Sequence, residues 1–295
     1  MKVLDPTDAL LASLRTAHEH GQSETTNDID KVMSTVSQTV CYVMPDFTLS
    51  DPTLIVLTER DQVRTFYENE RTTMEVVDSA HLTEVSSDWY AFYEGVATTR
   101  SVADGKLYNS NHVVLFPVAD DGIIGEILWA RRSFRDIYAG VPAPPPLVPP
   151  AHLADLPWLR WRNQELHDWF LDALRDGDVD AAVSTFAFDA RMAVRDYREG
   201  CGPMLQGNGT DVVRQRCRML VDSVEDREIT VLNRLVGDWY VFAEWVVRGH
   251  AVSGALRGVP GGARVQLRVA SIHPVTEEPK LRAELGYGLE ITVAP

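Results

Sequence analysis

Apolar residues near the start of the chain follow the spacing of a helix, and further along they alternate with polar residues. Leu10, Leu11 and Leu14 share one side of a predicted helix over residues 8–20. Because helices come first and a run of antiparallel strands follows, the pattern predicts an α+β fold. Further helices are predicted over 27–36 and 61–70, and strands over 40–47, 74–77, 81–85, 89–99, 107–118 and 122–131.

The same pattern occurs a second time, 150 positions later. The segment 88–94, DWYAFYE, returns as 238–244, DWYVFAE, and the offset holds from Asp28 onward. Further downstream, after an insertion, Glu126 corresponds to Glu284. A self-match at one fixed spacing is the signature of a tandem duplication, so each half of the chain is expected to form one domain.

The domain boundaries follow from a proline-rich stretch between the two copies. Six prolines fall within residues 142–150. Such a run is stiff and extended, and it does not join the interior of a sheet. We therefore predict a first domain at residues 1–139, a linker at 140–157 and a second domain at 158–295.

The composition is that of a globular chain with an acidic balance. Of the 295 residues, 45% are hydrophobic and 24% are charged, and the formal net charge is −15. A phosphate backbone or an anionic lipid surface repels such a charge, so no nucleic acid and no membrane is expected as a partner. The first 14 residues contain no long apolar run, so neither a signal peptide nor a membrane span is expected. Three cysteines without a close pair are typical of a cytoplasmic protein.

The second half carries the clearest likeness to a known family. A helix is followed by Gly177-Asp178-Val179-Asp180-Ala181, a strand that ends at Val194-Arg195-Asp196, and a helix that begins near Gly209. This order resembles the nuclear transport factor two superfamily, and within it the SnoaL-like polyketide cyclases and the ketosteroid isomerases. The resemblance covers both halves outside the linker. It implies two cone-shaped α+β barrels, each a strongly curved sheet closed by helices around an apolar pocket, and a pseudo-two-fold pair like the family's homodimers.

The resemblance also implies where carboxylates act. In ketosteroid isomerases, a strand of this type presents an aspartate that shuttles a proton, and Asp46 and Asp196 stand in its place. Tandem polyether epoxide hydrolases are similar as well. They pair the strand aspartate with an acid on the next strand, near Glu75 and Glu225 in this chain.

The first helix of each copy differs in one informative way. The second copy has Leu166, Phe170 and Leu174 on one stripe, whereas the first has Thr16, His20 and Glu24 at the same positions. Buried polar groups cost free energy unless they are paired, so the polar stripe indicates a pocket that holds water or a ligand. The alternative is a shifted or frayed first helix whose stripe is solvated.

The function that these patterns predict is acid/base chemistry without a cofactor. Asp46 moves a proton, and His20, held by Glu24, polarises the oxygen on which charge develops. The substrate is an apolar polycyclic or polyketide-like molecule, and the reaction is an isomerisation, cyclisation, elimination or epoxide hydrolysis. No metal site is expected, because His18 and His20 point about 200° apart on a helix.

Two other functions remain open from the sequence, a non-catalytic protein that binds hydrophobic small molecules and a structural pseudodimer. Further oligomerisation is also open. The second domain is interpreted as a degenerate copy.

His112 is a second possible donor in the pocket, or a packing residue. The candidate catalytic residues are Asp46, His20, Glu24, Glu75 and His112. The candidate substrate contacts are Thr16, Tyr42, Tyr67, Tyr93 and Trp129. The candidates in the second domain are Asp196, Glu225 and His273.

Overall fold

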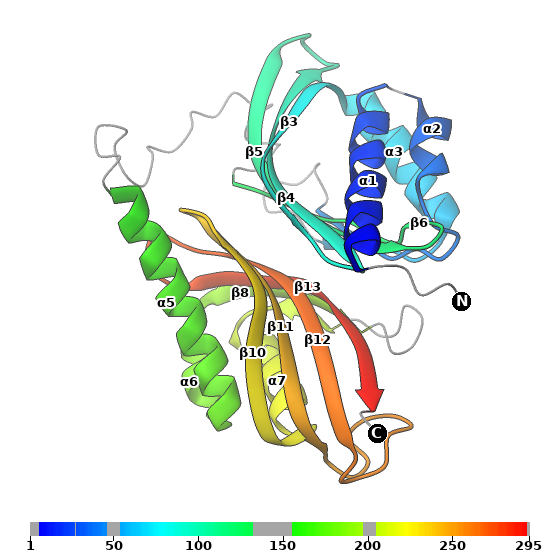
Figure 1. The fold of residues 1–295 in the computed structure, drawn as a ribbon. Coiled ribbons are helices and arrows are strands. Elements are labelled where there is room, and N and C mark those ends of the chain that lie inside the picture. The colour runs from blue at the N-terminus through cyan, green and yellow to red at the C-terminus, as the bar shows by residue number, and fades with distance from the viewer. Residues whose placement is uncertain (1–5, 27, 46–53, 132–154, 197–204, 294–295) are drawn as a thin grey trace. The chain divides into compact units, whose positions relative to one another are not determined.

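The computed structural model describes two compact units, which correspond to residues 1–144 and 145–295 (Figure 1). The residues described are 6–26, 28–45, 54–131, 155–196 and 205–293. Most of the predicted linker lies outside these ranges, so its bounds and the pseudo-two-fold relation stay predictions. No helix in the described ranges is long and apolar enough to cross a membrane.

The described part of the first unit contains three helices and a curved sheet. The helices are α1 (Pro6–Glu24), α2 (Ile29–Ser34) and α3 (Arg60–Thr73). The strands are β1 (Tyr42–Pro45), β2 (Leu54–Leu57), β3 (Met74–Ser86), β4 (Tyr90–Ser101), β5 (Leu107–Ala119), β6 (Gly122–Ile123) and β7 (Ile127–Ala130). Their order in the sheet is β2-β1-β7-β5-β4-β3, and β6 pairs with β5. In Figure 1 the long strands β3, β4 and β5 bend around the three helices.

The second unit repeats this arrangement. Its helices are α5 (Asp155–Asp176), α6 (Val179–Ser184) and α7 (Thr210–Val221). Its strands are β8 (Phe186–Asp196), β9 (Leu205–Asn208), β10 (Val224–Val236), β11 (Tyr240–Ala251), β12 (Arg264–Pro274) and β13 (Leu281–Val293). The sheet order β9-β8-β13-β12-β11-β10 matches that of the first unit strand by strand, including one parallel pair, β1 with β7 and β8 with β13. The two halves therefore share one α+β topology.

The third helix of the first unit packs as its spacing predicts. Val63 and Tyr67 are buried on α3, and Phe66 is partly buried against the same core. A capping box between Glu59 and Gln62 fixes the start of this helix, because each side chain binds a backbone N–H that the helix leaves unpaired. The capped helix holds Tyr67 pointing inward.

Helix α1 runs unbroken to Glu24, so the alternative of a frayed first helix is wrong. His20 is completely buried, and Glu24 is half-buried. Thr16 behaves differently, because its hydroxyl donates to the Ala12 carbonyl at 3.0 Å on the exposed side. At the matching positions of α5, Leu166, Phe170 and Leu174 are all buried in an apolar core.

The strand pattern is less regular than predicted. Residues 74–77 and 81–85, predicted as two strands, belong to the single strand β3, which contains two register shifts against β4. The predicted strand 122–131 is divided into β6 and β7. Glu126 lies between these two short strands, and its carbonyl accepts a hydrogen bond from the N–H of Val43 at 2.9 Å.

Candidate active site

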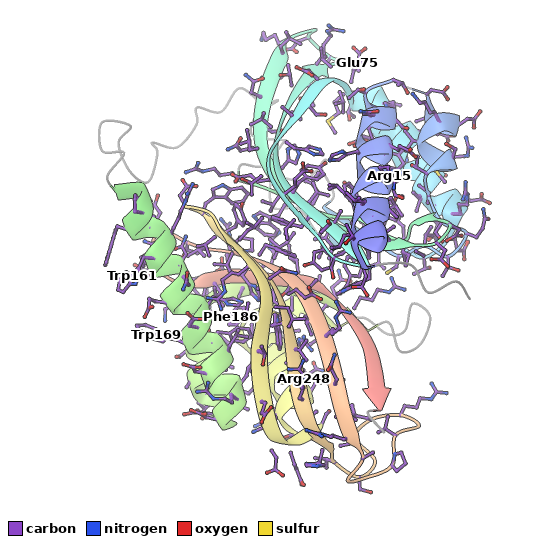
Figure 2. The ribbon with its side chains drawn as sticks, viewed as in Figure 1. Arg15, Glu75, Trp161, Trp169, Phe186 and Arg248 are labelled. Atoms are coloured by element: carbon purple, nitrogen blue, oxygen red, sulfur yellow. The ribbon has the colours of Figure 1, made fainter. Side chains whose placement is uncertain are left out.

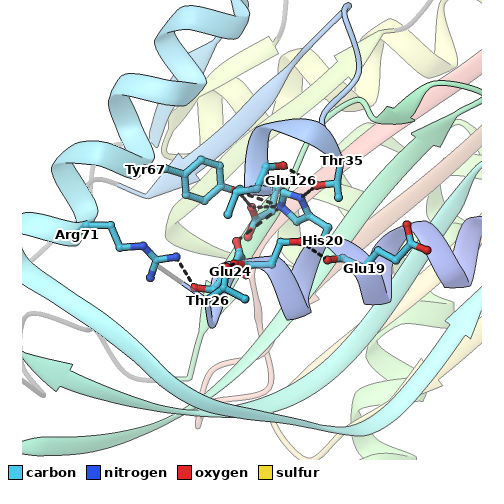
Figure 3. Close-up of polar contacts among 10 residues, drawn as sticks. Glu19, His20, Glu24, Thr26, Thr35, Tyr67, Arg71 and Glu126 are labelled. Atoms are coloured by element: carbon cyan, nitrogen blue, oxygen red, sulfur yellow. Dashed lines mark hydrogen bonds and ion pairs between the residues drawn. The ribbon is translucent and has the colours of Figure 1, made fainter. Parts of the chain in front are cut away.

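The centre of the candidate site is the buried imidazole of His20 (Figure 3). Its Nδ1 lies 2.6 Å from the Thr35 hydroxyl on the turn after α2, and its Nε2 lies 3.0 Å from the Tyr67 hydroxyl on α3. Burial lowers the pKa of His20 to about 3, so the ring is neutral at physiological pH. A neutral imidazole has one N–H donor and one acceptor nitrogen.

The neighbours of His20 assign its tautomer. The Thr35 hydroxyl donates its only proton to the Val32 carbonyl at 2.6 Å, so its oxygen accepts the proton of His20 Nδ1–H. The Nε2 atom is then an acceptor, and it takes a hydrogen bond from the Tyr67 hydroxyl. Both ring nitrogens are therefore engaged inside the protein.

Glu126 extends the chain of hydrogen bonds beyond Tyr67. The Glu126 carboxyl oxygen Oε2 lies 3.1 Å from the Tyr67 hydroxyl and 4.0 Å from His20 Nε2. Burial, together with the negative charges of Glu24 and Glu70, raises the pKa of Glu126 well above its usual range. The Tyr67 hydroxyl lies within hydrogen-bonding distance of both Glu126 Oε2 and His20 Nε2, and His20 donates to Thr35. The four side chains thus form one connected chain of hydrogen bonds, here called the relay.

Two more carboxyls lie at the edge of this relay. Glu24 Oε1 is 3.6 Å from His20 Nε2, and burial raises the pKa of Glu24 to about 7, against the opposing effects of Arg71 and Tyr67. Burial and the charge of Glu24 raise the pKa of Glu70 to about 8. Arg71 donates to the backbone carbonyl of Glu24 rather than to a carboxylate. Carboxyls in this setting exchange protons near neutral pH.

The second unit has the same scaffold with different charges. Val43 pairs with Ile127 as Ala193 pairs with Leu285, so Glu126 and Glu284, one residue earlier, hold the same place.

Glu284 is also fully buried, but Arg216 donates to it from Nε and Nη2 at 3.1–3.3 Å. The first unit has Phe66 where the second has Arg216, so the matching cation is missing beside Glu126. In addition, Phe170 replaces His20, Leu174 replaces Glu24 and Cys217 replaces Tyr67. The relay therefore belongs to the first unit.

Three other predicted residues surround this group. The ring of Tyr42 is 6.4 Å from that of Tyr67, and Phe116 lies between His20 (5.3 Å) and Tyr93 (5.7 Å). His112 packs against Tyr93 at 5.9 Å, and burial lowers the pKa of His112 to about 4. Burial also raises the pKa of Tyr42, Tyr67 and Tyr93 well above 10, so the phenols remain donors. The structure brings these rings together around His20.

Other predicted residues lie elsewhere. Glu75 forms an ion pair with Arg100 at 2.5 Å and lies at the outer end of the first unit's sheet (Figure 2). Trp129 pairs with Val113, which alternates with His112 along β5, so Trp129 is on the opposite face of the sheet from His112. Neither residue is part of the group around His20.

The structure gives little information on the two aspartates predicted at strand ends, Asp46 and Asp196. Asp46 lies outside the described residues, so its proposed role stays a prediction. The backbone of Asp196 pairs with Gly288, but its side chain is also outside the described set. Glu225 is exposed on β10, and His273 is fully buried, with its ring 4.9 Å from that of His167.

Sequence reasoning missed Thr35 and Glu126 as members of the site. A signal existed for Glu126, because it is the one charged residue in the run Ile123-Ile124-Gly125-Glu126-Ile127-Leu128 and it recurs as Glu284. For Thr35 the repeat offers no distinction, because Thr185 makes the same bond to the helix carbonyl three residues earlier.

Among the described residues, two groups of side chains have the composition of a metal site. The ligand atoms of His20, Glu24 and Glu126 all lie within 4.8 Å of one another, and so do those of His18, His81 and Glu84. The first group coincides with the proton relay. The second is separate from it and was not expected from the sequence.

The second unit contains a cavity of about 150 Å³. Its lining combines apolar side chains with three guanidinium groups, from Arg195, Arg216 and Arg268. Arg216 is paired with Glu284, and Arg268 is paired with Glu244 at 2.6 Å. The interior of this unit thus carries ion-paired guanidinium groups, whereas that of the first carries a neutral imidazole and carboxyls whose pKa values are raised.

Each unit is thus an α+β fold in which helices pack on a curved sheet. Residues 167–282 match the SnoaL-like domain family, and the first unit repeats the topology of the second. No curated protein matches the chain by sequence.

Several solved structures are similar to part of the chain. The epoxide hydrolase/cyclase-like enzyme SalBIII, described in pyran ring formation in the polyether salinomycin, is 17% identical with a TM-score of 0.37, covering 45% of this chain and 97% of its own. A putative polyketide cyclase from Xanthomonas campestris is 22% identical with a TM-score of 0.33, covering 44% and 91%. A putative isomerase from Bacillus subtilis is 8% identical with a TM-score of 0.39, covering 46% and 97%.

Proposed function

We propose that the first unit is a cofactor-independent acid/base enzyme of the isomerase or cyclase type. The observation that carries the proposal is the buried relay of Glu126, Tyr67, His20 and Thr35, with Glu24 beside it at a pKa of about 7. Titratable groups whose pKa values are shifted toward neutrality by burial are typical of sites that transfer protons.

Glu24 is the group best suited to exchange a proton with a substrate. A general base works best when its pKa is close to the working pH, and Glu24 meets this condition while its side chain remains partly exposed. Asp46, implied by the family resemblance, remains the proposed second carboxylate. In this scheme, one ionised carboxylate removes a proton from carbon, and the other, protonated at the start, delivers its own proton at a different position. Exchange with solvent then restores both groups.

His20 has a different role from the one expected from the sequence. Both of its nitrogens bind protein groups, so the imidazole is proposed to keep the relay in order rather than to contact the substrate oxygen. The Tyr42 phenol, which stays protonated, is the proposed donor to an oxygen on which charge develops.

The substrate is proposed to be an apolar molecule with an acidic C–H next to a carbonyl, of polycyclic or polyketide-like structure. Aromatic rings at Tyr42, Tyr93 and Phe116 supply an apolar surface around the relay. The resemblance of the sequence to SnoaL-like polyketide cyclases supports this class of substrate.

Hydrogen exchange at carbon tests the proposal without knowledge of the natural substrate. A panel of steroid and polycyclic ketones is incubated with the protein in D2O, and deuterium uptake next to the carbonyl is followed by mass spectrometry. We expect uptake with the wild type, and a loss of about 10²–10⁴-fold in Glu24→Gln.

The matched control is Glu75→Gln, which removes an exposed, ion-paired carboxylate and is expected to keep the full rate. If Glu24→Gln exchanges as fast as the wild type, the proposal fails.

The second unit supports a separate candidate function, the non-catalytic binding of a small molecule. Its 150 Å³ cavity is bordered by Leu220, Leu256 and Val269. A metabolite released on denaturation of the purified protein, and retained by the Glu24→Gln variant, is the expected sign of such binding. A metabolite lost in Glu24→Gln would assign the ligand to the first unit.

A further inference from the structure

A second cluster of functional side chains lies on the flank of α1. His18 Nε2 is 2.7 Å from Glu84 Oε2, and His81 Nδ1 is 3.3 Å from the same oxygen. The rings of His18 and His81 are 4.9 Å apart. The three side chains are 40%, 37% and 23% exposed for His18, Glu84 and His81, so an ion reaches them from solution.

A β-bulge brings His81 and Glu84 to one face of the sheet. In a regular strand, residues three apart point to opposite faces. The pairing of β3 with β4 shifts by one between His81 and Thr83, so His81 is opposite Gly95 and Glu84 is opposite Tyr93. Gly95 and Tyr93 are two apart on β4, and they share a face.

Helix α1 supplies the third member of the cluster. His18 precedes His20 by two residues, which is a rotation of about 200° on a helix. His20 enters the buried relay, and His18 turns to β3, where it meets Glu84. The two histidines therefore serve separate clusters, and this inference does not depend on the proposed function of the relay.

The second unit has the same bulge but no such cluster. Its pairing shifts between Val231 and Asn233, as in the first unit. At the three matching positions it has Asp168, Val231 and Arg234. Arg234 binds Asp168 at 2.6 Å, so helix and strand are joined by a simple ion pair.

The comparison of the two units distinguishes two tasks of these side chains, which are tying the helix to the strand and binding a ligand. Two opposite charges are enough to tie the helix to the strand, as the second unit demonstrates. The first unit replaces both charges with groups that ligate metals, and it adds His81 at a position where the second unit has a valine. The added imidazole stacks on Tyr93 at 4.0 Å and 17°, which fixes its orientation toward Glu84.

We propose that His18, His81 and Glu84 bind one divalent transition-metal ion of the zinc class. Two imidazole nitrogens with one carboxylate favour zinc and its neighbours in the first transition row, whereas magnesium and calcium prefer oxygen ligands alone. Zinc–nitrogen and zinc–oxygen bonds of about 2.0–2.2 Å are within reach of ligand atoms that lie within 4.8 Å of one another. Three protein ligands leave the fourth position of the ion open to water or to a small ligand.

Calorimetric titration with zinc chloride tests the site in the full chain, after removal of metal with EDTA. The wild type is expected to bind one equivalent, and zinc is expected to raise its melting temperature. His81→Val, which copies the second unit, is expected to bind zinc at least about tenfold more weakly, because it removes a direct ligand. Glu84→Gln keeps the size of the side chain, and it is expected to show the same loss if His81→Val folds poorly.

Two controls distinguish this site from others. His250→Ala changes an exposed histidine that is paired with Asp226 at 3.5 Å in the second unit, and it is expected to keep one equivalent. Glu24→Gln tests the buried group of His20, Glu24 and Glu126, and it is also expected to keep one equivalent. The proposal is overturned if the wild type binds no zinc, or if His81→Val and Glu84→Gln bind it as the wild type does.

Discussion

Phe66 and Arg216 occupy the same place in the two copies, and they decide the charge of the carboxyl beside them. Arg216 holds Glu284 in an ion pair, whereas the first unit has no cation at this place, and burial raises the pKa of Glu126. The pKa of a buried carboxyl follows from the balance between desolvation and nearby charge. The missing cation, together with the neighbouring Glu24 and Glu70, thus separates a structural ion pair from a carboxyl whose pKa is raised.

Tyr67 is the residue that connects the two ends of the relay. Tyr67→Phe keeps the ring but leaves His20 Nε2 and Glu126 without their shared partner, and it is expected to cost about 1–3 kcal/mol in the free energy of unfolding. Urea denaturation measures this loss. Tyr108→Phe removes an exposed hydroxyl near the start of β5 and is expected to stay within about 0.5 kcal/mol of the wild type. Equal effects of the two substitutions would contradict the relay.

Substitution of His273 in the second unit is expected to stabilise the protein, in contrast to that of Tyr67. Neither of its ring nitrogens has a hydrogen-bond partner among the described residues, and burial lowers its pKa to about 4. The first unit has Phe116 at this position. His273→Phe is therefore expected to stabilise the chain by about 1 kcal/mol, because it removes a buried polar group that lacks a partner.

The increase in the free energy of unfolding caused by His273→Phe is expected to depend on pH. Between pH 6.5 and 4 the unfolded chain binds a proton at His273 that the folded chain does not, so acid destabilises the wild type at this site. The difference in unfolding free energy is therefore expected to be larger at pH 5 than at pH 7. A variant that is less stable at both values would contradict this account of His273.

At the scale of elements, β6 lies close to the turn after α2. This contact positions the Thr35 hydroxyl, which accepts the hydrogen bond from His20. The N–H of Ile123 donates to the Thr35 carbonyl at 2.9 Å, and Gly122 has a φ of +139°. A Cβ at Gly122 would meet the Thr35 carbonyl oxygen at 2.5 Å, so a side chain forces β6 away from the turn.

Gly122→Ala is therefore expected to destabilise the first unit by about 1–3 kcal/mol. Gly21→Ala is the matched control, because Gly21 lies in α1 and a Cβ there meets nothing within 4 Å. It is expected to stabilise by about 0.5–1 kcal/mol, since alanine favours the helix. Thermal unfolding of both variants measures the difference, and a neutral Gly122→Ala would show that the contact is not needed.

The sequence predicted some elements of the site for clear physical reasons. The polar stripe of α1 and the apolar stripe of α5 follow from helical spacing, which is a local property. The bulge in β3 could not be predicted, because the extra residue is defined only by the pairing with β4. Strict alternation puts His81 and Glu84 on opposite faces of the sheet. The sequence alone therefore did not predict that these residues belong to one metal site. Glu126 joins His20 through a contact between distant segments, which spacing alone does not reveal.

At the scale of the whole molecule, the two units are expected to respond differently to pH. Burial and the charge of Glu24 raise the pKa of Glu70, on α3 of the first unit, to about 8. From about pH 4.5 upward the unfolded chain loses this proton while the folded chain keeps it, so stability falls as the pH rises toward 8.

Glu70→Gln removes this effect and is expected to stabilise the first unit at pH 8, on the order of 1–2 kcal/mol, with little change at pH 4.5. Scanning calorimetry of the full chain measures it, with Glu225→Gln as the control because Glu225 is exposed in the second unit. A gain of equal size at both pH values would indicate a cause other than the ionisation of Glu70.

The titration of the Glu24 carboxyl tests most directly the claim that the first unit is an acid/base enzyme. Carbon-13 NMR of glutamate-labelled protein follows each carboxyl resonance with pH, and the spectrum of Glu24→Gln identifies the Glu24 signal. The account predicts a midpoint of about 7 for Glu24, with the relay of His20, Tyr67 and Glu126 intact. A midpoint close to 4.5 would contradict it, because an ordinary carboxylate at this position would not be poised to exchange protons at neutral pH.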